Sequence, residues 1–157
     1  MSGRVYLDWN ATAPLRPEAR AAMLAAMDAV GNPSSVHAEG RAARAIVERA
    51  RDQVARLAGC DRDQVVFTSG ATEAAMMAEP EGPRSASAVE HDCVWAVFAR
   101  DGAAGFGVRA DGQAEVSAAP EGAVALTLAQ GETGVLQDVG AVVARGAGPV
   151  TADAAQA

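Results

Sequence analysis

The chain of 157 residues is long enough for one domain with a buried core, and its 50% hydrophobic content argues against a disordered protein. Its formal net charge of −7 argues against nucleic acid as a partner, because no basic stripe offsets the acidic residues. No apolar run reaches the roughly 18 residues of a membrane span, and the first residues lack a secretory signal, so we expect a cytoplasmic protein. The two cysteines, Cys60 and Cys93, lack the spacing of a metal site, and reduced thiols are expected.

Two amphipathic helices are predicted in the first half of the chain. Pro17 favours the start of the first helix, which should run to about residue 30 and end at Gly31. The second should span about residues 38–58 and end at Gly59. Each helix should bury one apolar face, formed by Ala19, Met23, Ala26, Met27 and Val30 in the first and by Ile46, Ala50, Val54 and Leu57 in the second.

Strands and helices alternate from residue 64 onward. A β-branched strand is predicted at residues 64–67, leading into a turn of small residues and a helix start. Further strands are predicted at 85–89, 105–108, 123–128 and 150–153, with helices at about 92–100 and 137–145 and a loop or frayed helix at 110–122. This alternation indicates an α/β fold with a mostly parallel sheet and flanking helices in three layers.

The segment TSGATEAA, Thr68 to Ala75, follows the first predicted strand of this alternation. A phosphate group binds well to backbone N–H groups at a helix start, where small residues allow close approach and a hydroxyl adds a donor. Ser69, Gly70, Ala71 and Thr72 can supply this arrangement. A small-residue turn after a strand is more often ordinary strand-to-helix packing, so the segment alone does not decide between the two.

Two polar side chains stand at predicted strand ends. His91 follows Glu90 after one strand, and Asp153 closes the last one. An imidazole can stack on a flat ring and move protons near neutral pH, although a single histidine is more often structural. An aspartate facing a pyridine nitrogen keeps it protonated, although Asp153 could equally cap a turn.

Taken together in order, these segments resemble the front half of a cysteine desulfurase, a member of the class-V aminotransferases. The matching segments are TSGATEAA, Glu90-His91, GETGVLQD at Gly131 to Asp138, and DAAQ at Asp153 to Gln156. The resemblance covers nearly the whole chain. It implies part of the large domain of a fold-type I transferase dependent on pyridoxal phosphate (PLP). Residues 1–16 would form an N-terminal arm, and residues 17–157 an incomplete cofactor-binding domain.

The resemblance also implies roles for individual residues. The pair Ala71 and Thr72 would bind the cofactor phosphate. His91 would stack on the pyridine ring and take part in proton transfer, as the catalytic residue of this half. Asp153 would pair with the ring nitrogen and Gln156 would reach the ring hydroxyl.

The sequence departs from the family pattern near the expected pocket. The family has two asparagines where this chain has Gln130 and Gly131, and asparagines again where it has Ala75 and Met76. Glycine offers no side-chain donor, so one ring contact is lost. Weak cofactor binding is therefore expected.

The chemistry of the family needs a lysine, which normally holds PLP as a Schiff base. All 13 residues in the count of lysine plus arginine are arginines. Neither cysteine matches the sulfur-accepting cysteine of the family; Cys60 is expected to be structural and Cys93 a buried, inert thiol. We therefore expect a truncated desulfurase, inactive by itself, or a non-catalytic remnant or binding partner.

The resemblance implies L-cysteine as substrate, L-alanine as product, and sulfur transfer through an acceptor protein, as in iron–sulfur cluster assembly. A homodimer or a complementing second half is expected, with no nucleic acid, membrane or metal site. Another class-V enzyme, such as a selenocysteine lyase, remains an alternative, because the amino-terminal motifs are shared widely.

Overall fold

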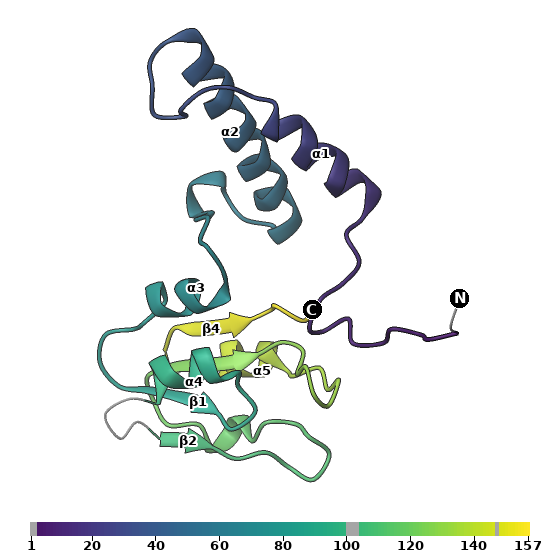
Figure 1. The fold of residues 1–157 in the computed structure, drawn as a ribbon. Coiled ribbons are helices and arrows are strands. Elements are labelled where there is room, and N and C mark those ends of the chain that lie inside the picture. The colour runs from purple at the N-terminus through teal and green to yellow at the C-terminus, as the bar shows by residue number, and fades with distance from the viewer. Residues whose placement is uncertain (1–2, 100–103, 147) are drawn as a thin grey trace. The chain divides into compact units, whose positions relative to one another are not determined.

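The computed structural model describes residues 3–99, 104–146 and 148–157 (Figure 1). Contacts divide the chain into two compact units, Met1–Phe67 and Thr68–Ala157. The first, the helical unit, contains only helices as regular structure, and the second, the sheet unit, contains the strands. The predicted boundary between residues 16 and 17 is a different division and stays a prediction.

The helical unit consists of α1 (Pro17–Met27), α2 (Ala38–Ala58) and the 3-10 turn η1 (Arg62–Gln64). The bounds predicted for the second helix are confirmed. Its N-cap is His37, whose Nδ1 accepts the N–H of Gly40 at 3.3 Å. It ends at Gly59, whose φ of 69° is the left-handed conformation that glycine adopts without strain.

The strand predicted at residues 64–67 is wrong. Gln64 ends η1, and the following residues are extended but pair with no strand among the described residues. Side chains of α2 hold this segment instead: the Arg51 guanidinium donates to the carbonyl of Val65 and lies 5.0 Å from the ring centre of Phe67. The β-branched residues correctly predicted an extended backbone, but a β-strand also needs a neighbouring strand to which it can hydrogen-bond.

The predicted apolar face of the first helix is wrong, and that of the second is only partly right: Ile46 and Ala50 are half-buried, but Val54 and Leu57 are exposed. α1 ends at Met27, three residues early, and Leu57 of α2 is 89% exposed. The buried residues of α2 are small: Gly40, Ala43 and Ala55. The loop before α2 packs closely on its first turn, because a Cβ at Gly40 would lie 2.4 Å from the carbonyl oxygen of Ser35. Among the described residues, few pack against the large apolar side chains of α1 and α2, which therefore stay exposed.

The sheet unit contains four parallel strands in the order β2-β1-β3-β4. Their bounds are Arg84–Ser87 for β1, Ala104–Phe106 for β2, Ala123–Thr127 for β3 and Val150–Asp153 for β4. The four strands predicted here are confirmed within a few residues. Because all are parallel, their carboxyl ends meet at one edge of the sheet.

Helices cover both faces of this sheet. α3 (Ala71–Met77) and α4 (Asp92–Phe98) pack on one face, where Ala123 and Ala125 of β3 meet Phe98. On the other face Val124 and Leu126 of β3 meet α5 (Val139–Arg145) and the 3-10 turn η3 (Val116–Ala118). All five residues of β3 are buried, so this strand is the centre of a three-layer α/β arrangement, as predicted (Figure 1). No helix of the described residues is long and apolar enough to cross a membrane.

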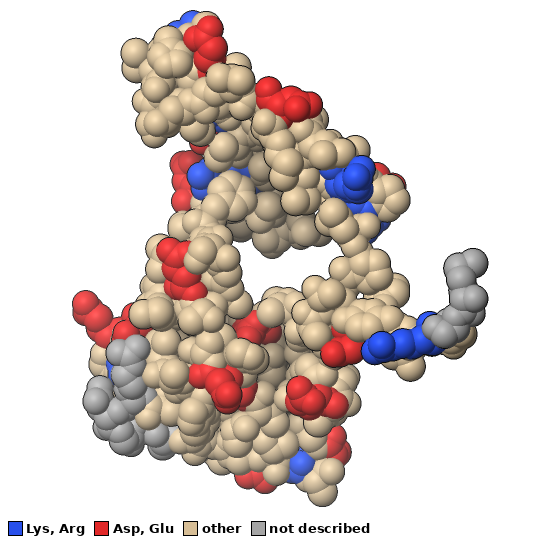
Figure 2. Space-filling model, in the orientation of Figure 1, with Lys and Arg blue, Asp and Glu red and all other residues tan. Residues whose placement is uncertain are grey.

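The sheet unit is strongly acidic. Residues 68–157 contain twelve aspartates and glutamates but only four arginines. Figure 2 shows acidic side chains scattered over the visible face of this unit, without a continuous basic patch there. An anion bound to this unit therefore needs backbone N–H groups more than basic side chains.

We predict that Leu126→Ala destabilises the protein by about 2–5 kcal/mol, because the side chain is fully buried and its removal leaves a cavity. The matched control is Leu136→Ala, at a leucine that is 67% exposed. Urea unfolding followed by circular dichroism measures both. Equal loss in the two variants would show that β3 is not the centre of the core.

Candidate functional site

Ligands of open parallel sheets bind outside the carboxyl ends of the strands. In the sheet unit this edge gathers residues from three neighbouring strands. Glu90 and His91 follow β1, Thr127 ends β3, and Asp153 ends β4 directly opposite Thr127 in the strand register. The edge therefore carries two carboxyl groups and an imidazole, which makes it the candidate site.

Glu90 links the turn after β1 to β3. Its Oε1 accepts the backbone N–H of Thr127 at 2.5 Å. Its Oε2 is buried and has no hydrogen-bond partner among the described residues. Burial raises the pKa of this carboxyl to about 7; the hydrogen bond from Thr127 opposes the rise, and the charge of Asp153 adds to it.

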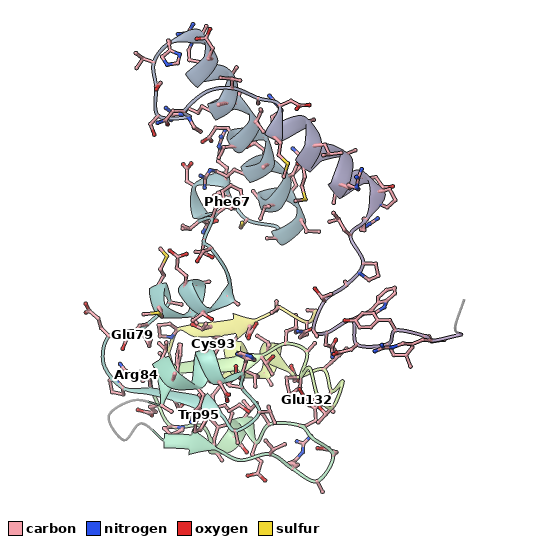
Figure 3. All side chains as sticks on the ribbon, viewed as in Figure 1. Phe67, Glu79, Arg84, Cys93, Trp95 and Glu132 are labelled. Atoms are coloured by element: carbon pink, nitrogen blue, oxygen red, sulfur yellow. The ribbon has the colours of Figure 1, made fainter. Side chains whose placement is uncertain are left out.

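His91 is the N-cap of α4 and is exposed. Its Nδ1 accepts the backbone N–H of Cys93 at 3.2 Å and lies 3.0 Å from the Sγ of the same residue. Nδ1 thus serves as an acceptor, and in the neutral ring Nε2 carries the proton. Cys93, labelled in Figure 3, packs against the core on the α3 and α4 side but is half-buried, not buried as predicted; its inertness stays a prediction.

Asp153 is half-buried at the end of β4. Its Oδ1 accepts the N–H of Ala155 at 2.9 Å, which is the turn-capping contact that the sequence left open. Its backbone carbonyl accepts the N–H of Leu128 at 2.7 Å, which holds it beside β3. Gln156 lies in the turn that follows and is exposed. The capping bond uses one carboxylate oxygen, so it does not prevent a ring contact by Asp153.

The predicted phosphate-binding turn lies at the start of α3. Ala71 and Thr72 are the first two residues of this helix and both are exposed. The N–H of Ser69 donates to the Oε2 of Glu73 at 2.5 Å, and this contact lowers the pKa of Glu73. A carboxylate therefore already occupies one backbone donor of the turn, which leaves the N–H groups of the first helical turn for a phosphate.

The segment GETGVLQD forms a tight turn after β3. Gln130 Oε1 accepts the N–H groups of Glu132 and Thr133 at 2.7 and 2.6 Å, so this side chain stabilises the turn. Gln137 is buried, and its Oε1 and Nε2 bind the backbone of Ala114 and Gly112 at 2.8 and 2.9 Å. Both glutamines have structural contacts that sequence reasoning missed.

The structure brings His91 and Asp153 to one edge of the sheet. It places Ala71 and Thr72 on α3, which packs against α4, the helix that His91 begins. Sequence reasoning gave Glu90 no role, although a carboxylate at the carboxyl end of a parallel strand is a signal for one. A surface hollow of about 970 Å³ lies elsewhere, between the 109–117 segment and α5, and none of the predicted site residues lines it.

Comparisons with known proteins identify the family and the fold of this chain. The family model of class-V aminotransferases matches residues 5–93, more than half of the chain. The chain belongs to the class-V aminotransferase family. PLP is the cofactor that this membership implies.

Individual class-V relatives match parts of the chain. A cysteine desulfurase of Frankia sp. (strain EuIK1) is 41% identical in an alignment of 133 positions that covers 76% of this chain and 32% of that protein. A selenocysteine lyase of Bos taurus is 49% identical over 73 residues, 46% of this chain and 17% of that protein. The solved structure of a NifS-like protein from Rickettsia africae superposes with a TM-score of 0.81 at 26% identity.

The Rickettsia superposition covers 94% of this chain and 47% of the NifS-like chain. The class-V fold is therefore shown for this chain. The chain spans less than half the length of these relatives, and the first of them matches along only a third of its own length.

We predict that Gln137→Ala lowers the free energy of unfolding by about 1–3 kcal/mol, because it leaves the N–H of Ala114 and the carbonyl of Gly112 without partners. Gln130→Ala, in an exposed turn, is the comparison and should cost less. Thermal unfolding measures both. A larger loss in Gln130→Ala would contradict this reading of the two side chains.

Glu90 predicts a specific dependence of stability on pH. Its folded pKa of about 7 exceeds the ordinary 4.5, so the folded state binds more protons between these values. Its contribution to stability is therefore full below about pH 4.5 and falls as the pH rises to about 7, with a slope of up to about 1.4 kcal/mol per unit. Urea unfolding at several pH values should show this slope in the wild type and not in Glu90→Gln. The control Glu121→Gln, an exposed site, should follow the wild type.

Proposed function

We propose that this chain supplies the amino-terminal part of the cofactor-binding fold of a PLP-dependent cysteine desulfurase acting on L-cysteine. The observation that supports the proposal is the edge of the sheet in a class-V fold at which His91 follows β1 and Asp153 ends β4. The match to the Frankia desulfurase over 76% of the chain supports the substrate class. In this proposal, sulfur passes to an acceptor protein in the cytoplasm, for uses such as iron–sulfur cluster assembly.

The residues at the sheet edge fit the cofactor. Asp153 would offer a protonated ring nitrogen a negative partner, and one oxygen of Glu90, at the same edge, is buried with no hydrogen-bond partner among the described residues. The exposed imidazole of His91 offers a flat surface beside them. The phosphate end depends on backbone N–H groups of α3, because Glu73 brings negative charge to the same turn.

Each residue would act through a stated group. The N–H groups of Ala71 and Thr72, with the Thr72 hydroxyl, would hold the phosphate. Asp153 would hold the proton of the ring nitrogen, and Gln156 would reach the ring hydroxyl. When bound, PLP supplies an electron sink for bonds at the α-carbon of an amino acid. His91 would cover the ring and move a proton through Nε2, since Nδ1 already accepts from Cys93.

The 157 residues contain no lysine that could bind the cofactor covalently. Both cysteines are half-buried, and neither matches the sulfur-accepting cysteine of the family motif. In this proposal the lysine and the sulfur-accepting cysteine come from outside these residues, on a further segment or a second subunit. The chain by itself then binds the cofactor weakly and has no desulfurase activity.

A second candidate is a selenocysteine lyase. The observation that favours it is the similarity to the selenocysteine lyase of Bos taurus, which is 49% identical to this chain over 73 residues. Because the shared residues lie in the cofactor-binding half, they do not distinguish sulfur from selenium. Binding of L-cysteine against L-selenocysteine to the PLP-loaded protein distinguishes the two. A protein that binds neither amino acid would favour a non-catalytic remnant or binding partner.

We predict that the chain binds PLP without a covalent bond and that Asp153→Asn weakens this binding about 10–100-fold. The change removes a charge-assisted hydrogen bond worth about 1.5–3 kcal/mol. Titration of PLP followed by absorbance and by quenching of tryptophan fluorescence measures the dissociation constants. Glu121→Gln, before the amino end of β3, is the control and should bind like the wild type.

The absence of a covalent bond is checked separately. Borohydride treatment of the PLP-loaded chain, followed by peptide mass spectrometry, should find no cofactor on an internal residue. Cofactor fixed to an internal residue, or equal affinity in Asp153→Asn and the wild type, would overturn the proposed site.

A further inference from the structure

Thr127 ends the central strand β3, and its backbone N–H faces the β1 side. N–H groups of alternate residues in a strand face the same neighbour, and the N–H of Ala123 donates at 2.9 Å to the carbonyl of Pro83, directly before β1. Four residues further along both strands, the matching acceptor for Thr127 is the carbonyl of Ser87. That carbonyl accepts the N–H of Glu90 at 3.1 Å instead, because the chain turns at this point. Thr127 is 6% exposed, so its N–H needs another acceptor inside the protein.

The side chain of Glu90 supplies that acceptor. Its Oε1 accepts the N–H of Thr127 at 2.5 Å and so replaces the carbonyl that β1 does not provide. A buried N–H without an acceptor is costly, which gives this contact a clear driving force. The contact also depends on length, because the carboxyl group must extend from the turn back to β3. An aspartate in this place would be one methylene group too short.

The turn that Glu90 fastens is the one that carries His91. On one side the turn is bound to β2, because the N–H of Ala88 donates to the last carbonyl of that strand at 3.0 Å. On the other side the Glu90 side chain binds it to β3. β3 in turn pairs with β4, where Thr127 lies opposite Asp153 in the register. The residue before His91 is therefore fastened to the strand whose neighbour ends in Asp153.

We propose that Glu90 is a positioning residue for His91, and that its hydrogen bond to the N–H of Thr127 sets where the imidazole stands at the carboxyl edge of the sheet. Nδ1 of His91 accepts the N–H of Cys93, which fixes the ring relative to α4. The Glu90 contact fixes the start of α4 relative to β3. Length and an acceptor atom perform this task, since an uncharged amide oxygen can accept the same N–H.

This inference rests on the proposed function only for the ring that His91 would cover. The position of His91 is a property of the chain without cofactor and is measured without it. A failure of cofactor binding would therefore leave the position of His91 testable, and a failure of the positioning test would leave the cofactor test unchanged.

The first test compares two variants with opposite properties in the 157-residue chain without PLP. Glu90→Gln removes the charge and keeps the length, whereas Glu90→Asp keeps the charge and shortens the side chain. NMR measures amide exchange of Thr127 and the ring resonances of His91. Glu90→Asp should accelerate the exchange about 10-fold or more and shift the His91 resonances, and Glu90→Gln should resemble the wild type. The second histidine of the chain, His37 in the helical unit, is the internal control and should not shift.

The second test separates positioning from a general structural role. PLP dissociation constants are measured for the wild type, Glu90→Asp, His91→Ala and the double variant. A residue that acts through His91 loses its effect when the imidazole is absent. Glu90→Asp should therefore weaken binding about 3–10-fold when His91 is present, and less than about 2-fold in the His91→Ala background. Costs that multiply in the double variant would overturn the proposal.

Three further results would overturn it. One is free exchange of the Thr127 N–H in the wild type, an observation that needs no variant to fold. Another is a set of His91 resonances that stays unmoved in Glu90→Asp, which would limit Glu90 to holding β3. The third is a Glu90→Gln variant that behaves like Glu90→Asp, which would make the charge the decisive property. Absence of PLP binding in the wild type would instead refute the proposed function, and the first test would still decide the role of Glu90.

Discussion

Burial of β3 from both sides is the constraint on which the sheet unit depends. Its residues alternate between two helix layers, with alanines toward α3 and α4 and Val124 and Leu126 toward α5. Such a strand has no solvent-facing side, so polar groups can appear only at its ends. Thr127 is that end, and its backbone N–H is satisfied by Glu90 from the neighbouring connection. The core thus determines where the polar edge forms.

The sheet edge and the phosphate turn differ in charge. Asp153 would favour a cation, whereas a phosphate bound at the start of α3, as proposed, would lie near Glu73, which accepts the N–H of Ser69. In a unit with twelve acidic residues and four arginines, long-range attraction does not help a phosphate. In the proposed site, the ring nitrogen and the phosphate of one cofactor molecule would therefore meet opposite local conditions, and the phosphate would depend on backbone N–H groups and the Thr72 hydroxyl.

Sequence patterns predicted the sheet unit better than the helical unit, for a physical reason. Residues 123–127 form a short apolar run between turn residues, and residues 150–153 a short segment before the DAAQ motif; both are strands, and they pair with each other in parallel. Residues 64–67 have an equally good local pattern but no neighbouring strand, and Arg51 binds the segment instead. Likewise, the apolar face of α2 was predicted mainly from its large residues, but the residues that are buried are small, among them Gly40 and Ala43. At Gly40 the preceding loop lies so close that a larger side chain would not fit. Local propensity does not contain information on what lies alongside a segment.

The same distinction holds for the candidate site. Ala71, Thr72, His91, Asp153 and Gln156 were identified through motifs, which record residues that act on a ligand. Glu90 stands beside His91 in one of those motifs, yet its role depends on a hydrogen bond to a residue 37 positions away. This is a relation between strands, and it becomes visible only when the order β1-β3-β4 is known. A group that joins the strands around a site is therefore harder to find from sequence than one that belongs to a ligand-binding motif.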